Sequence, residues 1–154
     1  MRFQKSGFRI IFLLLVFLAV SCGRKPEKEK QNNVASGEEV NSGITETSRD
    51  TLALNLKNGF VSGAVHKEER DKKYFVFQTD GPAKLSAKLV SQDTTANIRF
   101  TQIFFPDGSA DGPFGRELKY DLEQAGTHTL SVGENMMAGN PWSGDFTIEV
   151  KLDQ

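Results

Sequence analysis

The segment with the most suggestive side-chain spacing is residues 107–112, which read DGSADG. Asp107, Ser109 and Asp111 place oxygen-bearing side chains at alternate positions, and Ca²⁺ prefers several oxygen ligands of this kind. A complete loop of this type also has a bidentate carboxylate at its twelfth position, where this chain has Leu118. Asp, Ser and Gly are equally the ordinary residues of a hairpin turn. The segment is therefore either a calcium site or a turn, and we expect no other cofactor.

The chain offers little for catalysis, because it contains only two histidines, His66 and His128. A nucleophilic triad needs a nucleophile, a base and an orienting acid in contact, and no nucleophile-elbow sequence occurs. His66 precedes a polar turn, and His128 lies in an expected strand, facing solvent or a neighbouring side chain. We therefore predict that the protein is not an enzyme. A small metal-dependent hydrolase, with either histidine facing carboxylates, is the alternative.

A third group of residues is suited to binding. Met136, Met137 and Trp142 flank the loop sequence at 139–141, and Phe114 stands between glycine-containing turns. Exposed loop aromatics stack on sugar rings or anchor protein partners, and methionine adapts to irregular surfaces. These four residues are the predicted ligand-binding residues. The alternative is that Trp142 covers one end of the core, the methionines fill a gap beneath the loop, and Phe114 tucks inward.

The beginning of the chain has the layout of a secretory signal peptide. Three basic residues, Arg2, Lys5 and Arg9, precede an apolar run at 10–20 and small residues before Cys22. The run is too short to span a bilayer core of about 30 Å, which needs roughly 20 apolar residues. We expect residues 1–21 to be removed as a signal peptide.

Residues 18–22, with the sequence LAVSC, resemble the lipobox of bacterial lipoproteins. The resemblance implies a diacylglycerol on the Cys22 sulfur, cleavage before Cys22, and acylation of the new amine; two or more chains anchor a protein stably. Cys22 is the only cysteine, and acylation would account for the odd thiol. Gly23 is not the Asp that favours inner-membrane retention, so the outer membrane is expected. The alternative is ordinary cleavage beside an incidental cysteine.

Residues 22–50 are expected to form a flexible linker. They are rich in Lys, Glu, Asn, Ser and Gly and contain no aromatic residue, so they cannot bury enough surface to offset their ordering entropy. Residues 51–154, about 100 in number, are a normal size for one domain. Without the signal peptide the formal charge falls from −1 to about −4, which excludes an electrostatic footprint for nucleic acid.

The predicted domain has a strand pattern throughout. Apolar and polar residues alternate in short runs separated by Gly, Pro, Asn and Asp, and no helical stripe occurs. About seven to nine strands at roughly 10-residue spacing predict an all-β protein, an antiparallel sandwich or barrel. The runs are residues 52–56, 60–65, 74–77, 85–89, 98–104, 130–132 and 146–150.

The order of these motifs resembles the bacterial pre-peptidase C-terminal domain. The resemblance implies a jelly-roll β-sandwich, usually appended to secreted enzymes, that is itself non-catalytic and in some members binds calcium or insoluble polymers. The family tends to have acids where this chain has Lys72, Lys73 and Arg99, which counts against an inherited calcium site. The matching segments are residues 63–65, 71–77, 104–108, 125–132 and 144–150.

These inferences combine into one expectation. The chain is a membrane-anchored extracytoplasmic lipoprotein with a non-catalytic β-sandwich that binds a glycan or an envelope protein. The alternative is a structural envelope lipoprotein without a small-molecule ligand.

Overall fold

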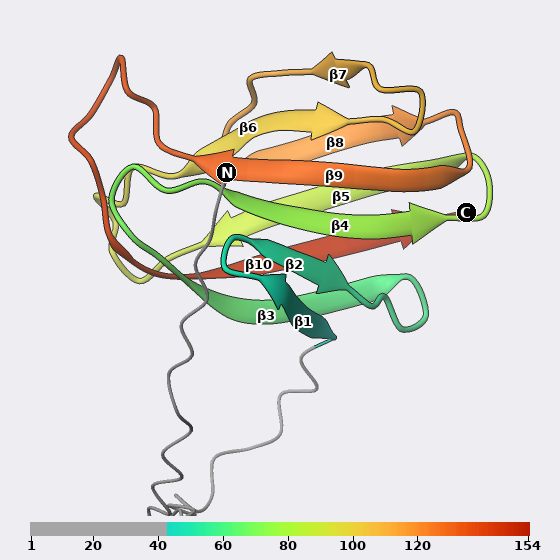
Figure 1. The fold of residues 1–154 in the computed structure, drawn as a ribbon, viewed down its shortest axis with the longest axis horizontal. Coiled ribbons are helices and arrows are strands. Elements are labelled where there is room, and N and C mark those ends of the chain that lie inside the picture. Colours follow the sequence, from blue (N-terminus) through green and yellow to red (C-terminus); the bar gives the residue numbers. More distant parts are fainter. Residues whose placement is uncertain (1–42) are drawn as a thin grey trace, which may run out of the picture. The chain divides into compact units, whose positions relative to one another are not determined.

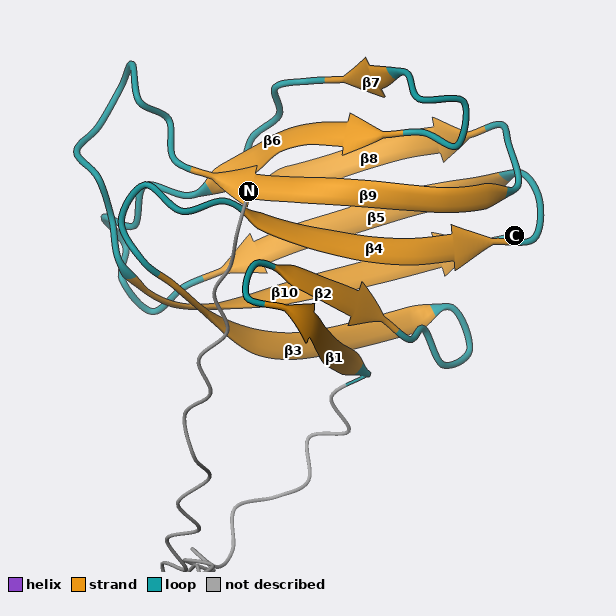
Figure 2. Ribbon diagram, viewed as in Figure 1, coloured by secondary structure: helices purple, strands orange, loops and turns teal. Residues whose placement is uncertain are grey.

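Strands joined by turns and irregular loops make up residues 43–154, the part of the chain that the computed structural model describes. Ten strands form two facing sheets, which confirms the predicted β-sandwich (Figures 1 and 2). The described part contains no helix that could cross a membrane. The predicted signal peptide, Cys22 and most of the predicted linker lie outside the described residues.

The first sheet has six strands in the order β1-β2-β4-β9-β6-β7. Its pairs are antiparallel except for β2 and β4, which run parallel. Its strands are β1 (Ile44–Ser48), β2 (Thr51–Leu54), β4 (Lys73–Thr79), β9 (Gly126–Gly133), β6 (Arg99–Phe104) and β7 (Ala110–Asp111).

The second sheet has four antiparallel strands in the order β3-β10-β5-β8. The last strand along the chain, β10, therefore lies inside the sheet between two strands formed much earlier in the sequence. The strands are β3 (Phe60–Lys67), β10 (Gly144–Asp153), β5 (Ala83–Val90) and β8 (Glu117–Leu122).

The core forms where the apolar positions of each strand face the other sheet. Phe75 of β4 and Phe146 of β10 meet across the sandwich with ring centroids 6.3 Å apart and an interplanar angle of 79°. An edge-to-face pair of this kind contributes about 0.5–1.5 kcal/mol beyond the area that it buries. Leu130, Ile148 and Val150 are fully buried beside them, so period-2 alternation on both sheets produces one continuous core.

A tight turn at Asn58 and Gly59 connects the two sheets. Both residues have positive φ, 51° and 75°, and Lys57 and Phe60 exchange both backbone hydrogen bonds at 3.0 and 3.1 Å. An Asn-Gly pair is the usual solution for a turn that requires two left-handed residues. A Cβ on Gly59 would lie 2.5 Å from the carbonyl oxygen of Leu152, so the close approach also requires glycine.

The sheet begins earlier in the chain than predicted. Strand β1 starts at Ile44, before the expected domain start at Thr51, and pairs with β2. Its sequence, ITETS, has β-branched residues at three of five positions, which favour strands. Ile44 packs against the core while the rest of the strand is exposed. The strand is therefore mostly polar, and its composition resembles that of the linker before it.

Candidate functional site

A buried ion pair lies at one end of the sandwich. The Nζ of Lys67, at the end of β3, donates to Oε1 of Glu134 at 2.8 Å, and their side chains are 0% and 3% exposed. The same ammonium also donates to the carbonyl oxygens of Glu68 at 2.7 Å and Trp142 at 3.1 Å. All three donor positions of Lys67 are therefore used, as burial of a charge requires.

The Glu134 carboxylate connects two loops. Its Oε1 accepts the backbone N–H of Arg70 at 3.0 Å and that of Trp142 at 2.9 Å, in addition to Lys67. Burial raises the pKa of Glu134, but the hydrogen bonds from Lys67, Trp142 and Arg70 outweigh it and hold the pKa below its usual value. This one carboxylate thus fixes the β3–β4 loop and the β9–β10 loop to each other.

Trp142 is held in a defined orientation. Its indole Nε1 donates to Oδ2 of Asp93 at 2.8 Å, and the ring packs partly against the core. A Cβ at Gly144 would lie 2.6 Å from the indole Cζ2, so the ring lies directly over that glycine. The pKa of Asp93 is lowered by hydrogen bonds from Thr95 first and Trp142 second. The ring thus packs as the alternative interpretation expects, while the binding role of Trp142 stays a prediction.

The β9–β10 loop, residues 134–143, carries two exposed methionines and projects from the sandwich (Figure 1). Met136 is 59% exposed and Met137 is 98% exposed, so the expectation that they fill a gap beneath the loop is wrong. The side chain of Asn97 holds the backbone of the β9–β10 loop by three hydrogen bonds. Its Nδ2 donates to the carbonyl oxygens of Asn135 at 3.3 Å and Asn140 at 2.8 Å, and its Oδ1 accepts the Asn135 N–H at 3.0 Å.

A groove of about 550 Å³ lies beside Trp142. Ala64, Thr147 and Val90 line it from one cross-strand row of β3, β10 and β5, and Asp93 also lines it. The groove therefore combines a small, largely apolar row with the indole and a carboxylate, an arrangement able to hold an extended polar ligand.

His66 lies near this end of the sandwich, between two carboxylates. Its Nδ1 is 2.7 Å from Oδ1 of Asp145, and its Nε2 is 3.2 Å from Oε1 of Glu68. The hydrogen bond with Asp145, followed by that with Glu68, raises the pKa of His66. The Ser143 hydroxyl donates to Glu68 Oε2 at 3.1 Å and not to the imidazole, so these residues do not form a nucleophilic triad.

The two carboxylates bind opposite nitrogens of the His66 ring and so do not converge on a shared point. Within residues 43–154, no three His, Cys, Asp or Glu side chains are grouped to hold a metal ion. His66 of β3, Asp145 of β10 and Glu68 of the β3–β4 loop form an exposed group of hydrogen-bonded side chains, which we call the His66 clasp.

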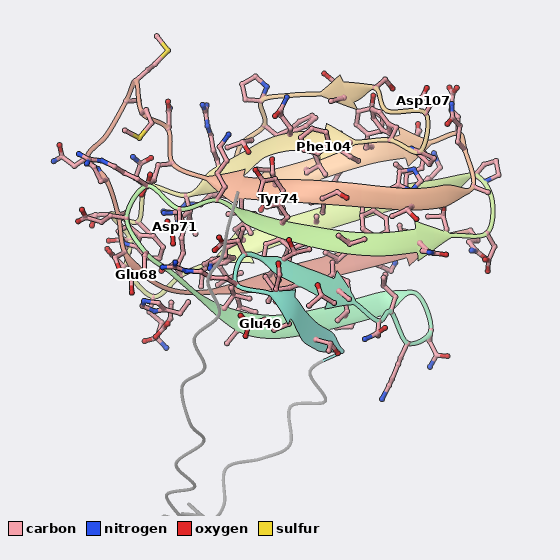
Figure 3. All side chains as sticks on the ribbon, viewed as in Figure 1. Glu46, Glu68, Asp71, Tyr74, Phe104 and Asp107 are labelled. Atoms are coloured by element: carbon pink, nitrogen blue, oxygen red, sulfur yellow. The ribbon has the colours of Figure 1, made fainter. Side chains whose placement is uncertain are left out.

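The predicted calcium loop lies at the other end of the sandwich, as the labels on Asp107 and Glu68 show (Figure 3). Asp107 Oδ1 accepts the backbone N–H of Ser109 at 2.9 Å and its hydroxyl at 2.6 Å, which together lower the pKa of Asp107. Asp111 lies in β7 and accepts the N–H of Gly112 at 2.7 Å. The first part of the segment is a turn between β6 and β7 and the second part is β7 itself, and calcium binding there stays a prediction.

Phe114 does not join Trp142. It is partly buried against the core at the β6–β8 side, where its ring contacts Tyr120 edge-on at 6.3 Å. Of the four predicted binding residues, the structure therefore brings together Met136, Met137 and Trp142 on one loop and places Phe114 elsewhere.

The sequence contains a signal for the buried pair of Lys67 and Glu134, although neither residue was predicted to belong to a site. Lys67 continues the inward positions of β3 after Val61 and Val65, and Glu134 continues those of β9 after Leu130 and Val132. A charged residue at an inward position indicates a buried partner of opposite sign. Asn97 and Asp93 gave no comparable signal, because Asn and Asp are common in any loop.

These features define a class of protein: a β-sandwich with a projecting loop held in place by a buried ion pair. No family model matches the chain, and no curated protein matches its sequence. Solved structures share the fold. Aeromonas hydrophila PliG, a periplasmic lysozyme inhibitor of g-type lysozyme, is 13% identical with a TM-score of 0.50, and the match covers 67% of this chain and 96% of that chain.

Two further solved structures are similar to this chain, with lower TM-scores. Salmonella Typhimurium PliG is 13% identical with a TM-score of 0.46, covering 68% of this chain and 99% of that chain. A PliG-Ec mutant from Escherichia coli is 11% identical with a TM-score of 0.48, covering 66% and 96%. At these identities the similarity shows the fold alone, and the resemblance to the pre-peptidase C-terminal domain stays a prediction.

Proposed function

We propose that this chain is an extracytoplasmic, non-catalytic module that binds a protein through its β9–β10 loop. The observation that carries the proposal is the position of Met137, 98% exposed on a loop fixed by Glu134, Lys67 and Asn97. Because the backbone of this loop is already held in place, binding orders only the side chains, and this limits the entropy cost of association. Methionine also adapts its shape to a partner surface.

A lysozyme of the g type is the first partner to test. The Aeromonas hydrophila structure with this fold is described as an inhibitor of that enzyme, and a non-catalytic sandwich that presents a firm loop is suited to the same task. After removal of residues 1–21 the chain would have a formal net charge of about −4. An acidic surface accelerates encounter with a basic partner.

The proposed location follows from the lipobox. Signal peptide 1–21, lipidated Cys22 and a linker would hold the sandwich outside the cytoplasm at a bacterial membrane, with the outer membrane favoured. Growth with radiolabelled palmitate tests this directly. Label on the wild-type chain, absent from Cys22→Ser, is the expected result, and an equally labelled variant would reject the anchor.

The binding proposal is tested with the processed chain, residues 22–154, carrying Cys22→Ser. The core of the described part, from Ile44 to Leu152, lies entirely within this processed chain. Calorimetry and a cell-wall lysis assay against a g-type lysozyme should show binding and inhibition. The double variant Met136→Ser/Met137→Ser should bind at least about tenfold more weakly, while Lys84→Ser, on the outer face of β5, should not differ.

The possible outcomes separate the parts of the proposal. No binding to any g-type lysozyme rejects that partner. Binding that is unaffected by the double methionine variant rejects the β9–β10 loop as the contact surface.

A glycan ligand is the second candidate, and the groove beside Trp142 favours it. Peptidoglycan fragments should then quench the Trp142 fluorescence saturably, with loss of the response in Asp93→Asn. Because Trp142 is the only tryptophan, the signal reports on this site alone. An unchanged spectrum at millimolar fragment concentration would reject the glycan candidate.

A further inference from the structure

The tip of the β9–β10 loop carries both methionines of the processed chain. The sequence contains three methionines, and because Met1 belongs to the predicted signal peptide, only Met136 and Met137 remain after its removal. The loop backbone turns at this point: the N–H of Ala138 donates to the carbonyl oxygen of Asn135 at 3.1 Å, and the N–H of Met137 donates to the Asn135 side-chain oxygen at 3.3 Å. This turn leaves Met137 98% exposed and Met136 59% exposed, and both sulfur atoms, yellow in Figure 3, lie on the projecting loop.

An exposed thioether is a site for oxidation by hydroperoxides. A sulfur lone pair attacks one oxygen of the peroxide, so that an S–O bond forms while the O–O bond breaks and water leaves after proton transfer. The sulfur loses two electrons, the peroxide gains them, and the product is methionine sulfoxide. The sulfoxide is polar and accepts hydrogen bonds, whereas the thioether is apolar and polarizable. Oxidation therefore reverses the surface property on which the proposed contact depends.

Other reactive side chains are shielded from an oxidant in solution. Trp142 is partly buried against the core, and its indole N–H is bound to Asp93 at 2.8 Å. His128 is 1% exposed and stacks on the neighbouring Phe77 ring at 5.4 Å instead of facing solvent. Cys22 is the only thiol of the sequence, and it is acylated in the proposed lipoprotein. A mild hydroperoxide is therefore directed to the loop tip.

The loop keeps its position without help from the methionine side chains. Neither methionine belongs to the core of the described residues or packs against it. The loop backbone is held from the interior by Glu134, which pairs with Lys67 at 2.8 Å, and by the amide of Asn97. These contacts involve no sulfur atom, so oxidation changes the polarity of the tip and leaves the anchoring contacts in place.

We propose that Met136 and Met137 form an oxidation switch, at which a hydroperoxide converts the apolar tip of the β9–β10 loop into a polar one and so abolishes its contact with a protein partner. The inference rests on the proposed function, because it concerns the regulation of the same surface. A sulfoxide buried in an apolar contact leaves an acceptor without a donor, which opposes binding. A methionine sulfoxide reductase reverses the change: a dithiol is oxidised to a disulfide, the sulfoxide oxygen leaves as water, and the thioether returns.

The first experiment needs no partner. The processed chain with Cys22→Ser is treated with hydrogen peroxide, and peptide mapping by mass spectrometry follows each methionine beside N-acetylmethionine amide as a fully exposed reference. Met137 should react at a rate within about twofold of the reference and Met136 more slowly, as their exposed fractions predict. The retention of the oxidised chain on a phenyl column should fall, because the column binds exposed apolar surface, while the thermal midpoint stays unchanged.

Two variants control this measurement. Met136→Leu/Met137→Leu keeps the apolar surface and nearly the same volume but has no sulfur, so peroxide should not alter its retention. Met137→Gln places a polar side chain at the tip and should be retained less than the wild type without any oxidant. Oxidation of both methionines more than about tenfold slower than the reference, a lowered thermal midpoint, or an equal response to peroxide in the leucine variant would overturn the proposal.

The second experiment uses a g-type lysozyme that binds the untreated chain. Peroxide is removed with catalase before mixing, and calorimetry should show binding weakened at least about tenfold by oxidation. Incubation with methionine sulfoxide reductases and dithiothreitol should restore the affinity, and Met136→Leu/Met137→Leu should bind equally before and after peroxide. Full affinity of the doubly oxidised chain overturns the switch.

The two experiments separate the switch from the proposed function. If Met136→Ser/Met137→Ser binds weakly and the oxidised chain binds normally, the loop is the contact surface and the switch is rejected. If no g-type lysozyme binds the untreated chain, that partner is rejected, and the peptide map and the phenyl column still decide whether oxidation converts the loop tip.

Discussion

Lys67 Nζ and Glu134 Oε1 meet at 2.8 Å in the interior although the two residues are 67 positions apart in the chain. The pair joins the end of β3 to the first residue of the β9–β10 loop, and the same carboxylate holds the backbone at Arg70 and Trp142. The geometry of the projecting loop therefore depends on a contact that lies beneath it and not on the loop sequence alone.

Replacing Lys67 should strongly destabilise the protein. Lys67→Met leaves the Glu134 carboxylate buried without its cation, and breaking a buried pair from one side costs about 3–5 kcal/mol. Urea unfolding of the processed chain measures the difference. Lys84→Met is the matched control, because Lys84 and Asp121 form an exposed pair whose loss costs about 0–1 kcal/mol. Equal losses in the two variants would contradict the role of the buried pair.

The exposed methionines should matter for binding and not for stability. Met136→Ser/Met137→Ser removes surface that touches little of the core, so the free energy of unfolding should stay within about 0.5 kcal/mol of the wild type. Trp142→Ala, in contrast, removes a ring packed on the core together with its bond to Asp93, and should lower stability clearly. A denaturant series on both variants decides; a large loss in the double methionine variant would show that the loop is structural.

The His66 clasp should make stability depend on pH. Because Asp145 and Glu68 raise its pKa in the folded state, its contribution is complete below the unfolded pKa of about 6.5 and disappears as the pH rises through the folded pKa. The thermal midpoint of the wild type should exceed that of His66→Gln at about pH 5.5 and approach it at about pH 9. A gap that widens with rising pH would contradict this assignment.

The turn at Gly59 should tolerate no side chain. Gly59→Ala combines a positive φ with a Cβ only 2.5 Å from a backbone oxygen, and should destabilise by more than about 1 kcal/mol. Gly81→Ala is the control, since a Cβ there meets nothing within 4 Å and φ is not positive; it should be neutral or stabilising by up to about 1 kcal/mol. Thermal unfolding of both variants gives the comparison.

The strands could be predicted from sequence because their signal is local. Phe75 and Phe77, or Phe146 and Ile148, lie two residues apart and both face inward, and period-2 spacing predicts this without knowledge of the partner strand. Strand β8 has the same alternation in Leu118, Tyr120 and Leu122 but was not among the predicted strands, because it follows a segment rich in Gly and Pro. The parity of His128 with Leu130 and Val132 likewise indicated burial.

The site could be predicted only in part, because its residues are brought together by pairing between distant strands. The prediction selected Met136, Met137 and Trp142 as neighbours in sequence, and they share a loop. The contact of Trp142 with Asp93 and that of His66 with Asp145 depend on how β10 aligns with β3 and β5. A one-residue change of register would move each side chain to the other face, and no local pattern fixes register between distant strands.

The interior place of β10 has a consequence for biosynthesis. The four-stranded sheet lacks one of its two inner strands until residues 144–153 are available, so a nascent chain cannot complete this half of the core before then. Pairings between such distant strands also form slowly, because the intervening chain must first be closed into a loop. The polypeptide would thus stay unfolded in this region until residues 144–153 have been synthesised, and an unfolded chain is the form that can pass through a narrow translocation channel.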